Sequence, residues 1–296
     1  MLNISIILKN NILKKLICTA ALFGVASIAA IAQTVAPAAP VTPKGEIMGT
    51  AWMHTAESLL ASAQTADVVL PAKATGSAVF TGKFKDIAKL SGSKVPVVVF
   101  MHGSSGLGLK AIGEWQLWLA TQGIASVAPD SFSLPGRVTY KSPIDADAYE
   151  RVHALRGSEI APMLNALKSQ PWVDTNQLIL AGSSEGSVPV ARYAGNEFMV
   201  RILYAWSCEQ NYFVKDPKNA FEAGKPVLNI ISSTDPFFSK SNSWVGNANP
   251  AGHCGTALKG NTSASVLLIP DAPHTVLGVP AARQATAGFL AQFIKN

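Results

Sequence analysis

The most specific chemical signal in the sequence is the pentapeptide at 182–186, which reads G-S-S-E-G and has the form G-x-S-x-G. It follows the apolar run at 178–181, a predicted strand, and it precedes a predicted helix. A serine on such a strand-to-helix turn presents its hydroxyl as a nucleophile, and amide hydrogens at the start of the helix can stabilise an oxyanion. The pentapeptide therefore predicts nucleophilic catalysis by Ser184, and the alternative is a serine that only caps a helix.

A serine hydroxyl becomes a strong nucleophile only when a base removes its proton. Asp235 and His274 each come shortly after a predicted buried strand, and both follow Ser184 in the chain. Because parallel strands end at one edge of a sheet, we expect the three side chains to meet there. His274 is then the general base and Asp235 the residue that orients it, with Asp271 and Glu222 as alternative acids.

A second glycine-containing turn lies upstream, at 102–106, where H-G-S-S-G follows the apolar run at 96–101. A loop in this place supplies one amide of an oxyanion hole, and the residue after the nucleophile supplies the other. The backbone amides of Ser104 and Glu185 are therefore the predicted donors.

Residues near the ends of predicted strands are expected to line a substrate pocket, and four are selected: His102, Gly103, Ser131 and Trp206. For His102 the alternative is support of its own loop, and for Trp206 it is a place in the core. The segments 133–148 and 237–262 are expected to shape the same pocket.

Short apolar runs alternate with amphipathic segments along most of the chain. The predicted strands are 68–70, 78–81, 96–101, 124–128, 178–181, 200–206, 227–231 and 265–269. The predicted helices are 50–64, one around 115–119, a long one over 145–169, one that follows the pentapeptide, and one over 280–294. This alternation predicts an α/β fold with a mostly parallel sheet and helices on both faces.

Over residues 95–296 the chain resembles an α/β-hydrolase, and specifically the dienelactone hydrolase family. The resemblance is carried by the pentapeptide, the H-G-S-S-G turn, the segment A-P-D-S-F at 128–132, and the late Asp235 and His274. It implies hydrolysis of esters, lactones or related acyl compounds without a cofactor. The namesake enzymes carry a cysteine nucleophile, whereas this chain has Ser184, which favours a general carboxylesterase acting on a small-molecule ester or lactone.

The first residues are typical of a secretory signal peptide, because lysines precede an apolar run at 16–32 that ends in A-I-A. An uncleaved membrane anchor is the alternative. We predict a signal peptide at 1–32, a tether rich in proline and alanine at 33–48, and a single domain at 49–296. The protein is then exported, either periplasmic or secreted, and meets the membrane only transiently through the signal peptide.

Cys208 and Cys254 lie in the predicted domain. In an oxidising compartment an even number of cysteines favours a disulfide, and two unpaired buried thiols are the alternative. No grouping of cysteine and histidine has the spacing of a metal site, so we expect no bound metal.

The formal net charge is +6, and much of the excess comes from three lysines in residues 1–32. The remaining excess is small and scattered, which argues against a nucleic-acid partner. The sequence does not indicate an oligomeric state.

Two other functions compete with the hydrolase. Gly103, Gly106 and Gly108 follow a strand and imitate a nicotinamide site, but their spacing is G-x-x-G-x-G in place of G-x-G-x-x-G. A non-catalytic exported binding protein on the same fold is the second alternative, and a broken triad would be its mark.

Overall fold

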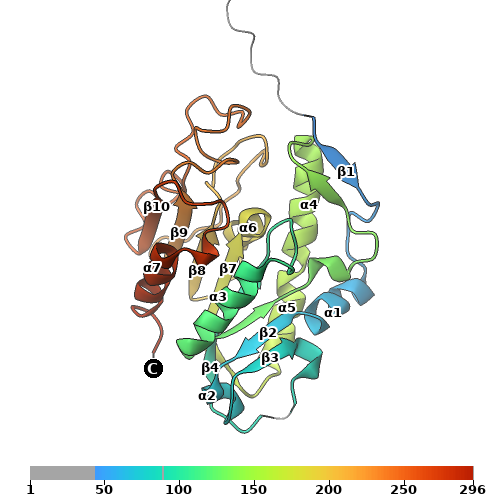
Figure 1. Ribbon diagram of the computed structural model, residues 1–296, viewed down its shortest axis with the longest axis vertical. Helices are drawn as coiled ribbons and strands as arrows, with labels where there is room; N and C mark the ends of the chain where they lie inside the picture. The colour runs from blue at the N-terminus through green and yellow to red at the C-terminus, as the bar shows by residue number, and fades with distance from the viewer. Residues whose placement is uncertain (1–43, 89, 296) are drawn as a thin grey trace, which may run out of the picture. The chain divides into compact units, whose positions relative to one another are not determined.

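The computed structural model describes residues 44–88 and 90–295, and its centre is an eight-stranded sheet (Figure 1). The strands are β2 (Asp67–Leu70), β3 (Phe80–Lys83), β4 (Val95–Met101), β5 (Ala125–Ala128), β7 (Val173–Ser183), β8 (Val200–Tyr204), β9 (Val227–Ser232) and β10 (Ala264–Ile269). Their spatial order is β10-β9-β8-β7-β4-β5-β2-β3, and the pairs from β10 to β5 are parallel. The two pairs that β2 makes, with β5 and with the edge strand β3, are antiparallel. The prediction of a mostly parallel sheet is confirmed.

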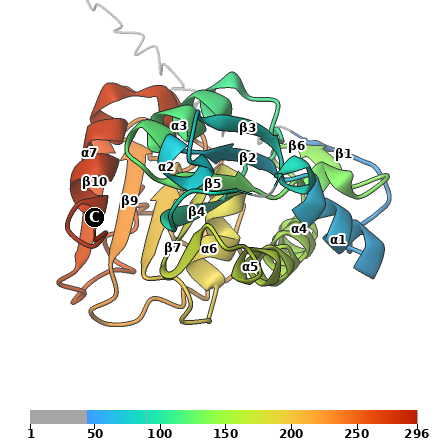
Figure 2. The same cartoon turned by 90° about the horizontal axis from the view of Figure 1, so that it is seen from below.

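Helices cover both faces of the sheet (Figure 2). They are α1 (Ala56–Gln64), α2 (Ala72–Thr75), α3 (Lys110–Thr121), α4 (Ala146–Ser158), α5 (Ile160–Lys168), α6 (Ser187–Arg192) and α7 (Pro280–Leu290). Successive strand side chains point to opposite faces, so Val98 and Phe100 of β4 pack with α3 and α7. Val97 and Val99 of the same strand pack with α5 and α6 on the other face. This double burial explains why β4 is apolar throughout.

The long helix predicted over 145–169 is in fact two helices, α4 and α5, which meet at Glu159. Pro162 explains the break, because proline has no N–H to donate and its ring would collide with a carbonyl of the preceding turn. In the first turn of a new helix the same residue is tolerated. The break places the Glu159 carboxylate in the interior, where it is 1% exposed.

The N-terminal part of the domain departs from prediction in two places. The helix predicted from residue 50 begins only at Ala56, after Thr55, which forms a reciprocal capping box with Ser58. Residues at the end of the predicted tether form a strand, β1 (Glu46–Met48), which pairs antiparallel with β6 (Thr139–Lys141).

The predicted signal peptide and most of the tether lie outside the described residues, so those assignments stay predictions. Among residues 44–88 and 90–295, the structure has no helix that is both long and apolar enough to cross a membrane.

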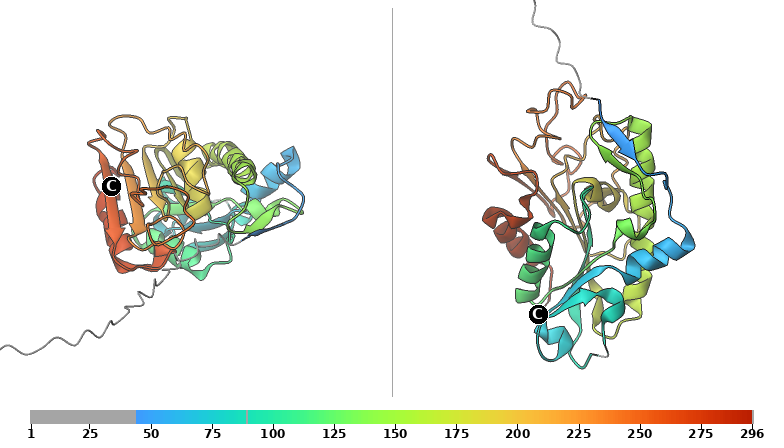
Figure 3. Two further views of the ribbon diagram at one scale, coloured as in Figure 1. Left: turned by 90° about the horizontal axis from the view of Figure 1, so that it is seen from above. Right: turned by 45° about the vertical axis from the view of Figure 1, so that its right-hand side comes forward.

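The predicted disulfide between Cys208 and Cys254 is confirmed, and it joins the loop after β8 to the long loop between β9 and β10. The ribbon of these two loops is coloured yellow to orange in Figure 3. Both cysteines are buried. The Asn229 side chain on β9 reinforces the link, because its amide donates to the Trp206 carbonyl and its oxygen accepts from the Cys254 N–H. The two loops are thus fixed to each other above the C-terminal ends of the strands.

We predict that the double variant Cys208→Ser/Cys254→Ser loses about 4 kcal/mol of its free energy of unfolding, because the bond closes a loop spanning 46 residues of sequence. Urea unfolding of the oxidised wild type and the variant measures the difference. Dithiothreitol should lower the stability of the wild type and leave the variant unchanged. Equal stabilities of the oxidised wild type and the variant would contradict this prediction.

Candidate active site

Ser184 stands on a sharp turn between β7 and α6, at the first residue of the short 3-10 helix Ser184–Gly186. Its φ of 53° lies in the left-handed region, which is strained for a residue with a side chain. The two glycines of the pentapeptide permit this turn. A Cβ on Gly182 would strike the Gly186 carbonyl oxygen, and a Cβ on Gly186 would strike the carbonyl oxygen of Met101 at the end of β4. The G-x-S-x-G spacing therefore follows from close packing of backbone on backbone.

Asp235 and His274 are hydrogen-bonded to each other. His274 Nδ1 donates to Asp235 Oδ2 over 2.7 Å, which leaves Nε2 with the lone pair of a proton acceptor. Asp235 is fully buried, and its other oxygen, Oδ1, accepts the backbone N–H groups of Phe237 and Phe238 at 2.9 and 3.0 Å. Both oxygens of the carboxylate are thus held in place. Such an arrangement fixes the tautomer and the orientation of the imidazole.

The alternative acids do not take this position. Within the described part of the chain, neither Asp271 nor Glu222 bonds to His274, and the Asp271 carboxylate instead accepts from the Thr234 hydroxyl at 3.3 Å. Of the three acids considered, only Asp235 is in contact with the imidazole.

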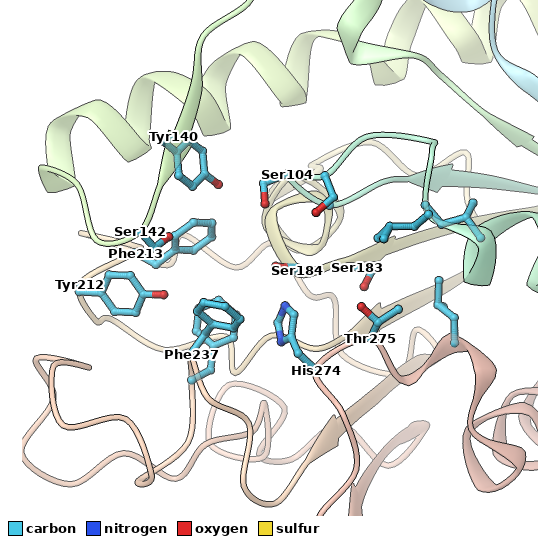
Figure 4. Close-up of a pocket in the computed structure, with 16 residues that line it drawn as sticks. Ser104, Tyr140, Ser142, Ser183, Ser184, Tyr212, Phe213, Phe237, His274 and Thr275 are labelled. Atoms are coloured by element: carbon cyan, nitrogen blue, oxygen red, sulfur yellow. The ribbon is translucent and has the colours of Figure 1, made fainter. Parts of the chain in front are cut away.

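Ser184 and His274 line one cavity (Figure 4). Among the described residues no hydrogen bond joins Ser184 Oγ to His274, although both side chains line the cavity. Contacts of this kind are often long before a substrate is bound. The geometry therefore brings Ser184 and the Asp235–His274 pair to one cavity. The hydrogen bond between Ser184 Oγ and the imidazole is not formed in this structure.

The loop after β4 lies directly against the turn that carries Ser184. A Cβ placed on Gly103 would stand 3.5 Å from Ser184 Cβ and 3.3 Å from the Ser183 carbonyl oxygen, so no larger residue fits easily. Ser104 follows in this loop and lines the cavity, while Glu185 follows Ser184 in the chain. The two predicted oxyanion donors thus belong to segments that pack on each other.

A buried group of charged side chains lies beneath the contact between the loop after β4 and the Ser184 turn, and it is centred on the Glu185 carboxylate. Arg137 Nη2 and Arg156 Nη1 both donate to Glu185 Oε1 over 2.8 Å, and the Tyr140 hydroxyl donates to Oε2 over 2.7 Å. Burial alone would raise the pKa of Glu185, but the two arginines and the Tyr140 hydrogen bond lower it to about 2. The carboxylate is therefore ionised and fully paired.

Arg156 extends this group to the loop after β4. Its Nη1 also donates to the His102 carbonyl over 2.8 Å, and its Nε donates to Glu159 Oε2 over 3.0 Å. The Glu159 carboxylate is in turn 3.1 Å from His54 Nε2. One guanidinium therefore ties the Ser184 turn, the H-G-S-S-G loop and the break between α4 and α5 to each other.

His102 supports its own loop from inside the protein. Its ring donates from Nδ1 to the Gly103 carbonyl over 2.7 Å and accepts at Nε2 from the Ser131 N–H over 3.2 Å. Burial lowers the pKa of His102 to about 3, and the positive charge of Arg156 adds to this effect. The ring is therefore neutral, which is the only state in which Nε2 can accept a hydrogen bond.

The cavity has a volume of about 170 Å³. Its lining residues are Gly103, Ser104, Ser105, Leu109, Ile112, Tyr140, Ser142, Ser183, Ser184, Tyr212, Phe213, Phe237, Phe238, His274, Thr275 and Leu277. Gly103 lies at the cavity as predicted, but the prediction is wrong for three other residues: His102, Ser131 and Trp206. All three are fully buried behind the cavity wall. Ser131 uses its hydroxyl to accept from Arg137 Nε, and Trp206 belongs to the core.

The segments 133–148 and 237–262 contribute to the cavity as expected, through Tyr140, Ser142, Phe237 and Phe238. Sequence reasoning did not identify Tyr212 and Phe213, which follow β8 in an irregular loop. Their position just after a strand end was the available signal. Among residues 44–88 and 90–295, no group of three or more His, Cys, Asp or Glu side chains is arranged to hold a metal ion.

We predict that Glu185→Gln lowers the free energy of unfolding by about 3–5 kcal/mol, because it leaves two buried guanidinium groups with less negative charge than they need. Glu114→Gln is the matched control, since Glu114 pairs with Lys110 at the surface, where solvent screens the pair, and the variant should lose far less stability than Glu185→Gln. Urea unfolding measures both. Similar losses in the two variants would contradict the proposed role of the buried charges.

The buried histidines predict loss of stability in acid. Burial lowers the pKa of His102 to about 3 and that of His153 to about 4, whereas in the unfolded chain both lie near 6.5. As pH falls below 6.5 the unfolded chain binds protons that the folded protein excludes. The free energy of unfolding therefore falls, by up to about 1.4 kcal/mol per pH unit for each histidine.

This loss is measured by urea unfolding between about pH 7 and 4.5, a range that covers the unfolded pKa near 6.5 and lies above the lowered pKa values of about 3 and 4 in the folded protein. His153→Gln should give a shallower dependence on pH than the wild type, because one of the two groups no longer titrates. Parallel curves for the two proteins would contradict the assignment of His153.

No family model and no curated protein matches this sequence. Solved structures do match. Esterase PE8 is 18% identical with a TM-score of 0.50, over 70% of this chain and 97% of that chain. A cold-adapted esterase from an Arctic intertidal metagenomic library, solved bound to PEG, is 18% identical with a TM-score of 0.50, over 69% of this chain and 85% of that chain.

A third similar structure is a dienelactone hydrolase-like promiscuous phosphotriesterase from metagenomic libraries, which is 19% identical with a TM-score of 0.49, over 69% of this chain and 89% of that chain. The likeness to the first two structures is one of fold. In this chain the mostly parallel sheet and the strand-to-helix turn that carries Ser184 at positive φ are features of the α/β-hydrolase fold. The chain therefore has the α/β-hydrolase fold.

Proposed function

We propose that this protein is a serine hydrolase that cleaves carboxylic esters through an acyl-enzyme. The observation that carries the proposal is the arrangement of three side chains. Ser184 stands on a strained turn and shares a cavity with His274, whose Nδ1 is bonded to the buried Asp235. This is the combination of nucleophile, base and orienting acid that acyl transfer requires.

In the proposed reaction His274 Nε2 accepts the proton of Ser184 as Oγ attacks the ester carbonyl. Asp235 stabilises the imidazolium that forms, and the backbone amides of Ser104 and Glu185 donate to the oxyanion. The imidazolium then protonates the leaving alcohol. Water, activated by the same imidazole, attacks the acyl-enzyme and releases the acid, which returns Ser184 to its starting state.

We place the protein with enzymes similar to dienelactone hydrolase, with serine in place of the cysteine nucleophile, and lactones belong to the same chemical class as esters. The packing of Gly103 against Ser184 supports this assignment over a nicotinamide site, because the glycine-rich loop is in contact with the nucleophile turn. No specific observation favours a non-catalytic binding protein.

Export is part of the proposal. The disulfide between Cys208 and Cys254 supports it, because such bonds persist in oxidising compartments. The lysine-rich and apolar composition of residues 1–32 supports it as well.

We predict that Ser184→Ala lowers kcat for p-nitrophenyl acetate by a factor on the order of 10⁶, to the limit of detection, and that Asp235→Asn lowers it by about 10⁴. The wild type should also be labelled covalently by a fluorophosphonate, and Ser184→Ala should not be labelled. Ser241→Ala, which changes an exposed serine away from the cavity, is the control. It should keep the kcat of the wild type for p-nitrophenyl acetate and should still be labelled by the fluorophosphonate. Labelling of Ser184→Ala equal to that of the wild type would overturn the proposed function.

A further inference from the structure

One side of the cavity is an aromatic wall, in which Figure 4 shows Tyr140, Tyr212, Phe213 and Phe237. The Phe238 ring, which also lines the cavity, belongs to this wall through its contacts with three of these rings. Each ring contacts at least one neighbouring ring along the wall. Phe238 has its ring centroid 5.5 Å from that of Phe213, 6.3 Å from Tyr212 and 6.3 Å from Phe237, and Tyr140 is 6.5 Å from Phe213. The wall is therefore continuous. It ends beside the base, because the Phe237 and His274 ring centroids are 4.6 Å apart.

The disulfide supports this wall. All of its members except Tyr140 lie between Cys208 and Cys254 in the chain, in the segments that the bond fixes to each other. The wall is thus held in shape before a substrate arrives, which reduces the entropy lost on binding.

The cavity has a second, aliphatic side. Leu109 and Ile112 come from the start of α3, and Leu277 comes from the 3-10 helix Val276–Gly278. These two elements contact each other. The cavity is thus aromatic on one side and aliphatic on the other. Ser184 and His274 line the same cavity.

Among the described residues that line the cavity there is no aspartate, glutamate, lysine or arginine. The two arginines of the neighbouring charge group cannot serve a substrate, because Arg137 and Arg156 are 5% and 0% exposed and both are bonded to Glu185. A substrate carboxylate would lose its hydration without gaining a cationic partner, which is costly.

The volume limits the size of the substrate. At about 170 Å³ the cavity is close to the ~150 Å³ of an apolar cavity that binds benzene. One six-membered ring and a short group fill this space, so the rest of a longer acyl chain would lie outside the cavity.

We propose that the substrate is an uncharged ester with a single aromatic ring, which lies against the aromatic wall while a short group occupies the aliphatic side. The reaction performed on it rests on the proposed function. Each ring-to-ring contact in the right geometry favours an aromatic ligand over an apolar one of equal area by about twofold to tenfold.

Two matched pairs of esters test the ring. Methyl phenylacetate is compared with methyl cyclohexylacetate, and benzyl acetate with cyclohexylmethyl acetate, so that the ring lies on the acyl side in one pair and on the alcohol side in the other. We expect kcat/KM to favour the aromatic member of at least one pair by about fivefold or more, within the range for aromatic contacts. The para-carboxy derivative of the better ester should react at least about 100-fold more slowly, because its charge is buried unpaired.

Tyr212→Leu removes one half-buried ring from the wall, and the preference for the aromatic ester should fall with it. Tyr193→Leu is the matched control, because Tyr193 is also half-buried but does not line the cavity. The preference of Tyr193→Leu for the aromatic ester should equal that of the wild type. An unchanged preference in Tyr212→Leu would count against the wall as its source.

Binding to Ser184→Ala separates this inference from the proposed function. Calorimetry gives the Kd of the same esters without turnover and without any change in the wall. If no ester is hydrolysed but the aromatic members bind more tightly, the ring preference stands and the hydrolase proposal fails. If aromatic and cyclohexyl esters are hydrolysed and bound equally, or the carboxylate derivative is preferred, this inference is overturned and the hydrolase proposal stands.

Discussion

The arrangement of the site depends on one buried carboxylate, that of Glu185. Because this residue directly follows Ser184, the two arginines and the tyrosine that hold its side chain also hold the strained serine turn. Arg156 passes the constraint on to the His102 carbonyl, and thereby to the loop that carries Ser104. A backbone in the left-handed region costs free energy, and it persists only where the surroundings fix it firmly. Here that fixation comes from charges paired inside the protein.

The walls of the cavity are stabilised in a different way. The segments that carry its aromatic side chains, except for Tyr140 in β6, have no regular secondary structure, so the sheet does not define their shape. The disulfide and the Asn229 side chain connect them to each other and to β9. Two of the same residues, Phe237 and Phe238, supply the amides that hold Asp235. The wall and the orientation of His274 are therefore coupled through one short stretch of chain.

Sequence patterns were sufficient for the sheet, which depends on local periodicity, and for the approach of Ser184, Asp235 and His274, which depends on chain order and strand ends. They were also sufficient for the disulfide, which the even number of cysteines in the domain favoured. Sequence patterns were insufficient where the direction of a side chain matters. His102, Ser131 and Trp206 lie near strand ends as expected, yet their side chains point into the interior. The partners of Glu185 are 29 to 48 positions away in the chain, and no local pattern identifies them. Pro162 was a visible signal for the break between α4 and α5. The helical spacing of apolar residues on both sides of Pro162 was misleading, because it predicted one continuous helix.

The charges that hold the Ser184 turn also bear on what our proposal allows the cavity to bind. Arg137 and Arg156 lie next to the site, and either could have recognised an anionic substrate if it faced the cavity with a free donor. Instead they balance Glu185 and Glu159 within the interior, two cations against two anions, and expose almost none of their surface. A group that must stay paired to hold the fold cannot also exchange its partner for a ligand without the loss that follows from an unpaired buried charge. The requirement for a rigid turn thus leaves no lysine, arginine, aspartate or glutamate among the described residues that line the cavity. In our proposal, ring contacts and shape then supply its selectivity.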